Sequence, residues 1–187
     1  MNLNTKYTFR EGKLGHDFCK DFFKSVKEQI DSSTSFTIIG IPSVGVSFFL
    51  RFLTMQDFAY FIHVDLYALP TLTKIEFYKA MLRQLDGKVD NVSEEELLDR
   101  CRKKIEELAK NHTKIVLILN RFDQLQKEFD KKFFENIRSL RNIDGGKIVI
   151  ITTATRPLDE INAEAISGSN LNFYSKHLFF KPYSLRT

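Results

Sequence analysis

Residues 38–50 read IIGIPSVGVSFFL, and they connect an apolar run to an apolar helical segment through a short loop. The run from Phe36 to Ile39 is aromatic and aliphatic, as in a buried strand. Gly40 and Gly45 stand five positions apart in the loop. The apolar residues after Gly45 predict a helix that ends near Leu53. The segment therefore predicts a strand, a glycine-containing loop and a helix in direct succession.

The loop matches the phosphate-binding pattern G-x-x-x-x-G-K-[ST] at each specified position except the lysine. Gly40, Gly45 and the Ser47 hydroxyl are present, and Val46 stands where the pattern has lysine. Backbone N–H groups of such a loop and of the following helix bind phosphate oxygens without any side chain. The lysine adds a point charge at the β- and γ-phosphates. We therefore expect a phosphate-binding backbone that lacks its usual cation.

Composition indicates a globular protein, which we expect to form a single domain over residues 1–187. The net charge of +4 is mildly basic and is not by itself a sign of nucleic-acid binding. Cys19 and Cys101 lie on the apolar faces of predicted helices, so we expect reduced core thiols. No apolar run approaches the ~18 residues of a membrane span, and the N-terminus carries no signal sequence. These features predict a cytoplasmic protein without a membrane segment.

Hydrophobic patterning predicts five buried strands separated by helices. The predicted strands are 35–39, 58–66, 114–119, 147–152 and 176–180. The predicted helices are 14–30, 45–53, 71–85, 94–110 and 130–142. Ser93 and Glu96 have the spacing of a capping box, in which Ser93 caps the helix and Glu96 reaches back. Strands alternating with helices imply an α/β domain with a mostly parallel sheet covered by helices on both faces.

Two later stretches resemble AAA+ ATPases of the origin-recognition type and STAND signalling ATPases. Residues 115–125 read IVLILNRFDQL, similar to the Walker B strand, in which aliphatic residues precede Asp, Glu and often Phe-Asp-x-Leu. Asn120 and Arg121 stand at the two acidic positions, and Phe122, Asp123 and Leu125 match the Phe-Asp-x-Leu that follows them. Residues 148–153 resemble the sensor-1 strand, in which Thr152 or Thr153 would supply the polar sensor.

The resemblance covers residues 35–185 and implies a three-layer P-loop NTPase-like fold, with residues 14–30 as an N-terminal helix. It implies a five-stranded sheet of order 5-1-4-3-2, with the pocket at the carboxyl ends of strands 1 and 3. The sequence ends where the family's helical lid would begin, so we expect either that the sequence is a fragment or that the lid is absent. The implied ligand is ATP or ADP, with Ser47 and Asn120 at the positions that contact Mg²⁺. The implied nucleotide contacts are Gly40, Ile41, Pro42, Ser43, Val44, Gly45, Val46, Ser47, Arg121, Thr153 and Arg156.

Three departures fall at the reaction centre of that family, namely Val46, Asn120 and Arg121. Asn120 brings no charge, and Arg121 cannot act as a base because it stays protonated. Removing one well-placed electrostatic group commonly costs ~10²–10³ in rate, so we expect little or no hydrolysis. Arg121 is the cation that we expect to contact phosphate, and Arg51 is more simply a surface residue. Asp123 is expected to hold the end of its strand through a loop contact.

Several functions remain open at this point. The first is a nucleotide- or phosphate-binding ATPase-like switch with degraded catalytic motifs. The second is a pseudo-ATPase scaffold that binds another protein, and the third is an ATPase completed in trans by a second copy. Nucleic-acid binding ranks last because it rests on family analogy alone.

Overall fold

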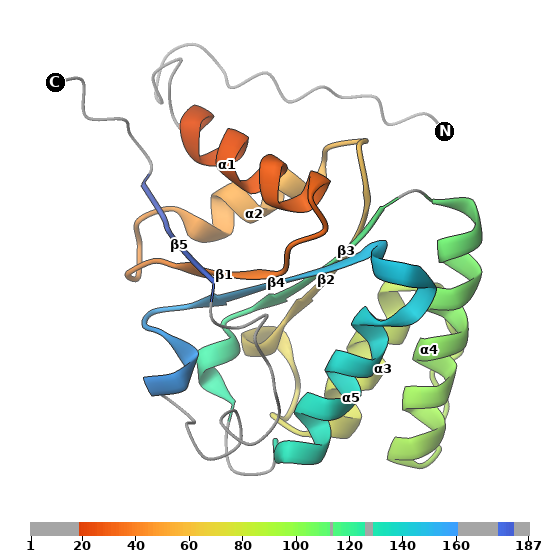
Figure 1. Ribbon diagram of the computed structural model, residues 1–187. Helices are drawn as coiled ribbons and strands as arrows, with labels where there is room; N and C mark the ends of the chain where they lie inside the picture. Colours follow the sequence, from red (N-terminus) through yellow and green to blue (C-terminus); the bar gives the residue numbers. More distant parts are fainter. Residues whose placement is uncertain (1–18, 113, 126–128, 161–175, 182–187) are drawn as a thin grey trace, which may run out of the picture.

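The computed structural model describes residues 19–112, 114–125, 129–160 and 176–181, and we refer to these as the described residues (Figure 1). Their strands form one sheet of order β2-β3-β4-β1-β5, in which every pair is parallel. This confirms the predicted order 5-1-4-3-2, read from the opposite edge. The strands are β1 (Phe36–Ile39), β2 (Tyr60–Asp65), β3 (Ile115–Asn120), β4 (Ile148–Ala154) and β5 (His177–Phe179).

Helices cover both faces of the sheet and make the three layers that the resemblance implies (Figure 1). One face carries α1 (Lys20–Asp31) and α2 (Val46–Thr54), and the other face carries α3, α4 and α5. The bounds of these three helices are Lys74–Gln84, Glu94–Asn111 and Lys131–Arg141. Short 3₁₀ turns are η1 (Leu66–Ala68), η2 (Phe122–Gln124), η3 (Ile143–Gly146) and η4 (Leu158–Glu160). Residues 14–18 of the predicted first helix lie outside the described residues.

The interior strand β3 shows why an uninterrupted aliphatic run suits this sheet. All its residues are buried. Ile115, Leu117 and Leu119 join the core cluster beneath α3, α4 and α5. Val116 and Ile118 join the cluster beneath α1 and α2. Because successive side chains of a strand point to opposite faces, a strand covered twice needs an apolar residue at every position.

The helix starts follow local capping chemistry. The Ser93 hydroxyl accepts a hydrogen bond from the Glu96 N–H at 3.3 Å, which confirms the predicted cap. The Glu96 carboxylate accepts a 2.6 Å hydrogen bond from Arg100, one turn further along the same helix. The helix expected to begin at residue 71 begins at Lys74, because the Thr73 hydroxyl accepts from the Glu76 N–H and caps it there.

The two cysteines are free and buried, as expected of core thiols. Burial raises the pKa of Cys19 and of Cys101 to about 12, so both thiols are protonated at neutral pH. Among the described helices, none combines the length and the apolarity that crossing a bilayer demands.

Phenylalanine rings form the contact between α5 and α3. The Phe133 ring is fully buried, and its centre lies 5.0 Å from the centre of the Phe77 ring and 4.8 Å from that of the Phe129 ring. Both pairs are edge to face. Such pairs add ≈ 0.5–1.5 kcal/mol each beyond the area that they bury. Phe133 therefore holds a central place in this layer.

We predict that Phe133→Ala lowers the free energy of unfolding by about 3–5 kcal/mol, because it removes a ring and leaves a cavity. Chemical denaturation monitored by circular dichroism measures this loss. The neighbouring exposed Lys132→Ala serves as control and should stay within about 0.5 kcal/mol of the wild type. A loss below about 1 kcal/mol for Phe133→Ala would show that the ring does not hold the layer together.

Candidate functional site

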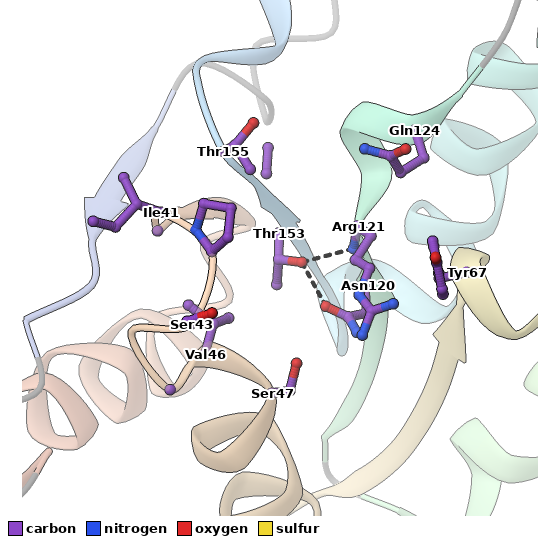
Figure 2. A pocket seen from close by; sticks show the side chains of 14 residues that line it. Ile41, Ser43, Val46, Ser47, Tyr67, Asn120, Arg121, Gln124, Thr153 and Thr155 are labelled. Atoms are coloured by element: carbon purple, nitrogen blue, oxygen red, sulfur yellow. Dashed lines mark hydrogen bonds between the residues drawn. The ribbon is translucent and has the colours of Figure 1, made fainter.

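A cavity of about 450 Å³ lies where β1, β3 and β4 end (Figure 2). The carboxyl edge of a parallel sheet is where ligands of this architecture bind, because loops and helix N-termini meet there. The described residues that line the cavity are Gly40, Ile41, Pro42, Ser43, Gly45, Val46, Ser47, Tyr67, Asn120, Arg121, Gln124, Thr153, Ala154 and Thr155.

One wall of the cavity is the loop between β1 and α2, in the position that the sequence predicts. Gly45 is the N-cap of α2 and has φ 104°, a conformation that residues with a Cβ rarely adopt. The Gly45 carbonyl accepts the Phe49 N–H at 2.9 Å and starts the helix. Within the described residues, the amides of Gly45, Val46 and Ser47 have no backbone acceptor. They are the unpaired first-turn donors that can hold an anion.

Val46, which replaces the lysine, packs inward against the loop. A Cβ added to Gly40 would lie 2.5 Å from the Val46 Cγ2 atom, closer than two such atoms can approach. Val46 also packs against the core cluster beneath α1 and α2. The position therefore contributes an apolar contact to the loop and no charge.

The opposite wall is tied together by the Thr153 hydroxyl. Thr153 Oγ1 donates to Asn120 Oδ1 at 2.7 Å and accepts the Arg121 N–H at 2.7 Å (Figure 2). Asn120 is only 2% exposed, and its oxygen is used by this contact. The other sensor candidate, Thr152, bonds the Thr37 hydroxyl inside the sheet. Thr153 is therefore the one that lines the cavity, and it fastens the end of β3 to β4.

Arg121 brings a positive charge to the same wall. Its backbone is left-handed at φ 59° and ψ 44°. Its Nη2 lies 3.7 Å from Asp65 Oδ2, and its Cζ lies 4.7 Å from the centre of the Tyr67 ring. Arg121 is the one charged side chain in the described lining of the cavity. Figure 2 shows it with Asn120 across the cavity from the loop that carries Ser43 and Ser47.

Two expected contacts lie outside the lining, and four lining residues were not predicted. Val44 packs toward the core, and the exposed Arg156 is not among the lining residues. Arg51 is exposed and outside the lining, in agreement with its expected place on the surface. The lining residues that were not predicted are Tyr67, Gln124, Ala154 and Thr155. The place of Tyr67 and Gln124 in the chain could have indicated them, because each belongs to a short turn that directly follows a strand. Tyr67 lies in η1 after β2, and Gln124 lies in η2 after β3.

The described lining of the cavity carries one positive charge and no carboxylate. Ser47 has a hydroxyl in the lining, and Asn120 Oδ1 accepts the Thr153 hydroxyl. Asp123 Oδ2 accepts from the Thr155 N–H at 2.9 Å and from its hydroxyl at 2.6 Å, which is the strand-end contact expected for Asp123. The described residues hold no group of three or more His, Cys, Asp or Glu side chains that could bind a metal. The lining therefore offers hydrogen-bond donors and a positive charge to an anion, and no carboxylate to a magnesium ion.

Comparison with known proteins agrees with this architecture. The sequence model of the AAA domain family matches residues 17–161, and the chain belongs to that family. A search of curated protein sequences found no match.

Solved structures give the fold. The match with Cdc6p from Pyrobaculum aerophilum covers 95% of this chain and 48% of the Cdc6p chain, with TM-score 0.65 and 13% sequence identity. The match with the Aeropyrum pernix ORC1 protein in complex with DNA covers 90% of this chain and 46% of the ORC1 chain, with TM-score 0.65 and 11% identity. The match with the Walker-type ATPase PABY2304 of Pyrococcus abyssi covers 88% of this chain and 53% of the ATPase chain, with TM-score 0.57 and 16% identity. The chain spans about half the length of these proteins and shares the P-loop AAA+ fold with them.

The contact between positions 40 and 46 predicts a strong coupling. We expect Gly40→Ala to destabilise the wild type by about 1–3 kcal/mol, because the new methyl group meets Val46 Cγ2. In a Val46→Ala background that atom is gone, and most of this cost should vanish. A double-mutant cycle of denaturation midpoints measures the coupling. Equal costs in the two backgrounds would show that Val46 does not pack against Gly40.

Proposed function

We propose that the domain binds the phosphate groups of ATP or ADP in this cavity and serves as a conformational switch with little or no hydrolysis. The observation that carries the proposal is the loop between β1 and α2, with left-handed Gly45 and the unpaired amides of Gly45, Val46 and Ser47. These donors bind phosphate through the backbone, so the missing lysine weakens binding without abolishing it.

Weak hydrolysis follows from the chemistry of the opposite wall. Hydrolysis needs a group that orients the attacking water and charges that neutralise the transferring phosphoryl group. The described lining of the cavity contains no Asp, Glu or His, and Arg121 stays protonated. Val46 offers no charge at the lysine position. Each such loss commonly costs ~10²–10³ in rate, and the losses occur at one centre.

A second candidate function is a scaffold that binds another protein. Ile41 and Phe179 are 67% and 60% exposed, and they lie on neighbouring segments because Phe179 pairs with Ile39 in the sheet. Clustered exposed apolar side chains are typical of interaction surfaces. In this case the cavity is not used, and ATP at millimolar concentration does not bind the wild type.

Replacing Val46 separates binding from hydrolysis. We predict that Val46→Lys binds ATP at least about ten-fold more tightly than the wild type, since a charge-assisted hydrogen bond is worth ≈ 1.5–3 kcal/mol. Phosphate release by the same variant should stay at background, because Asn120 and Arg121 are unchanged. Isothermal titration calorimetry measures the affinity, and a phosphate assay measures turnover. Met55→Lys adds the same charge at the far end of α2 and should leave the affinity unchanged.

The phosphate assay is run over a range of protein concentrations, because a second copy could supply a missing group. Turnover that rises with the concentration of the wild type would favour an ATPase completed in trans. Rapid turnover by Val46→Lys would show that the wall formed by Asn120 and Arg121 supports hydrolysis after all.

A further inference from the structure

The described lining of the cavity contains no carboxylate. Within the lining, Asn120 Oδ1 receives the Thr153 hydroxyl, and beside it Asp123 Oδ2 receives two donors from Thr155. Mg²⁺ in phosphate-transfer sites is held by one or two carboxylates together with the phosphates. The Ser43 and Ser47 hydroxyls in the lining cannot replace a carboxylate.

The carboxylate at the end of β2 lies near Arg121 but outside the lining of the cavity. Asp65 Oδ1 accepts the Tyr67 N–H at 3.1 Å, and Asp65 Oδ2 faces the Arg121 guanidinium at 3.7 Å. Asp65 is not among the residues that line the cavity. A divalent cation in the cavity would therefore meet the positive charge of Arg121 without a carboxylate in the described lining, and like charges at short range repel.

Arg121 brings the one positive charge of the described lining to the wall opposite the β1–α2 loop. Its N–H donates to Thr153, and this bond fixes the left-handed backbone at the end of β3. Its guanidinium lies over Tyr67, and the 3.7 Å distance to Asp65 is longer than a hydrogen bond, so the head group is not locked there. A guanidinium binds two phosphate oxygens at once through its planar fork.

We infer that this pocket takes a nucleotide phosphate free of Mg²⁺, with the Arg121 guanidinium neutralising the charge that the metal neutralises in other P-loop sites. The inference rests on the proposed function, since it concerns the same cavity. It goes further because it specifies the ionic form of the ligand: free ATP or another uncomplexed polyphosphate is the partner, and Mg²⁺ competes by complexing it. Arg121 is a binding residue in this account, and Thr153 positions its backbone.

The test is a calorimetric titration of the full chain with ATP in EDTA, and again with Mg²⁺ in large excess over ATP. We expect the dissociation constant to be at least ten-fold larger with Mg²⁺. Pyrophosphate in EDTA should also bind, which would show that the phosphates rather than the base are recognised. Equal or tighter binding with Mg²⁺ overturns the inference and leaves the proposed function standing. Binding in neither condition overturns both.

Variants at position 121 identify the source of the preference. Arg121→Asn removes the charge with a residue that tolerates the left-handed backbone. This variant should bind free ATP at least ten-fold more weakly than the wild type, and its dissociation constants in EDTA and in excess Mg²⁺ should be equal. Arg51→Asn removes the same charge from the exposed side of α2 and should change neither affinity. If Arg121→Asn keeps the wild-type affinity in EDTA, Arg121 does not bind the phosphate.

Restoring the acidic pair should reverse the preference. Asn120→Asp combined with Arg121→Glu supplies two carboxylates at the end of β3 and removes the guanidinium. We expect this double variant to bind ATP more tightly with Mg²⁺ than in EDTA. If its melting curve shows that it does not fold, Arg121→Lys takes its place, and it should keep the preference for free ATP with weaker binding. A preference for free ATP in the folded double variant would contradict the assigned role of Arg121.

Discussion

The turn from β1 into α2 depends on two positions where only glycine fits. At Gly40 a side chain would collide with Val46, and at Gly45 the backbone has a positive φ. These two constraints place the loop and the first turn of α2 at the edge where the parallel strands end. The donors that face the cavity are main-chain groups, so their position is set by the fold rather than by any one side chain. The loop can therefore keep its backbone geometry without the lysine of the motif.

The wall of the cavity opposite this loop is held by hydrogen bonds, and it carries a positive charge where the AAA+ pattern has negative ones. Where the AAA+ pattern has an acidic pair, this chain has an amide and a guanidinium, and Thr153 bonds to both residues. The hydrogen bonds preserve the junction between β3 and β4. The change of charge replaces two carboxylates with an amide and a guanidinium, and it leaves one positive charge in the described lining. The proposed function, binding with little or no hydrolysis, follows from this change.

The strands and helices could be predicted because their sequence signals are local, whereas the strand order came from the resemblance to AAA+ ATPases. Continuous aliphatic runs such as residues 115–119 are typical of strands covered on both faces, and the spacing of Gly40 and Gly45 placed the loop. The site was less predictable, since side-chain direction depends on neighbours that are remote in sequence. Arg156 follows β4 and yet is not a lining residue, whereas Tyr67 lines the cavity from the end of β2.

The sequence also did not predict which side chains and backbone groups pair with one another. The capping box predicted that the Glu96 carboxylate reaches back to the Ser93 amide, but the structure pairs this carboxylate with Arg100, one turn further along the helix. The left-handed backbone of Arg121 has no sequence signal either, because non-glycine residues rarely adopt it. It becomes visible only with the Thr153 contact, which joins residues 32 positions apart.

The most direct test of the central claim is an amide spectrum of ¹⁵N-labelled protein titrated with pyrophosphate in EDTA. If backbone donors hold the anion, the largest shifts belong to the amides of Gly45, Val46 and Ser47. An unchanged spectrum at millimolar pyrophosphate, or shifts confined to residues away from the β1–α2 loop, would contradict the account.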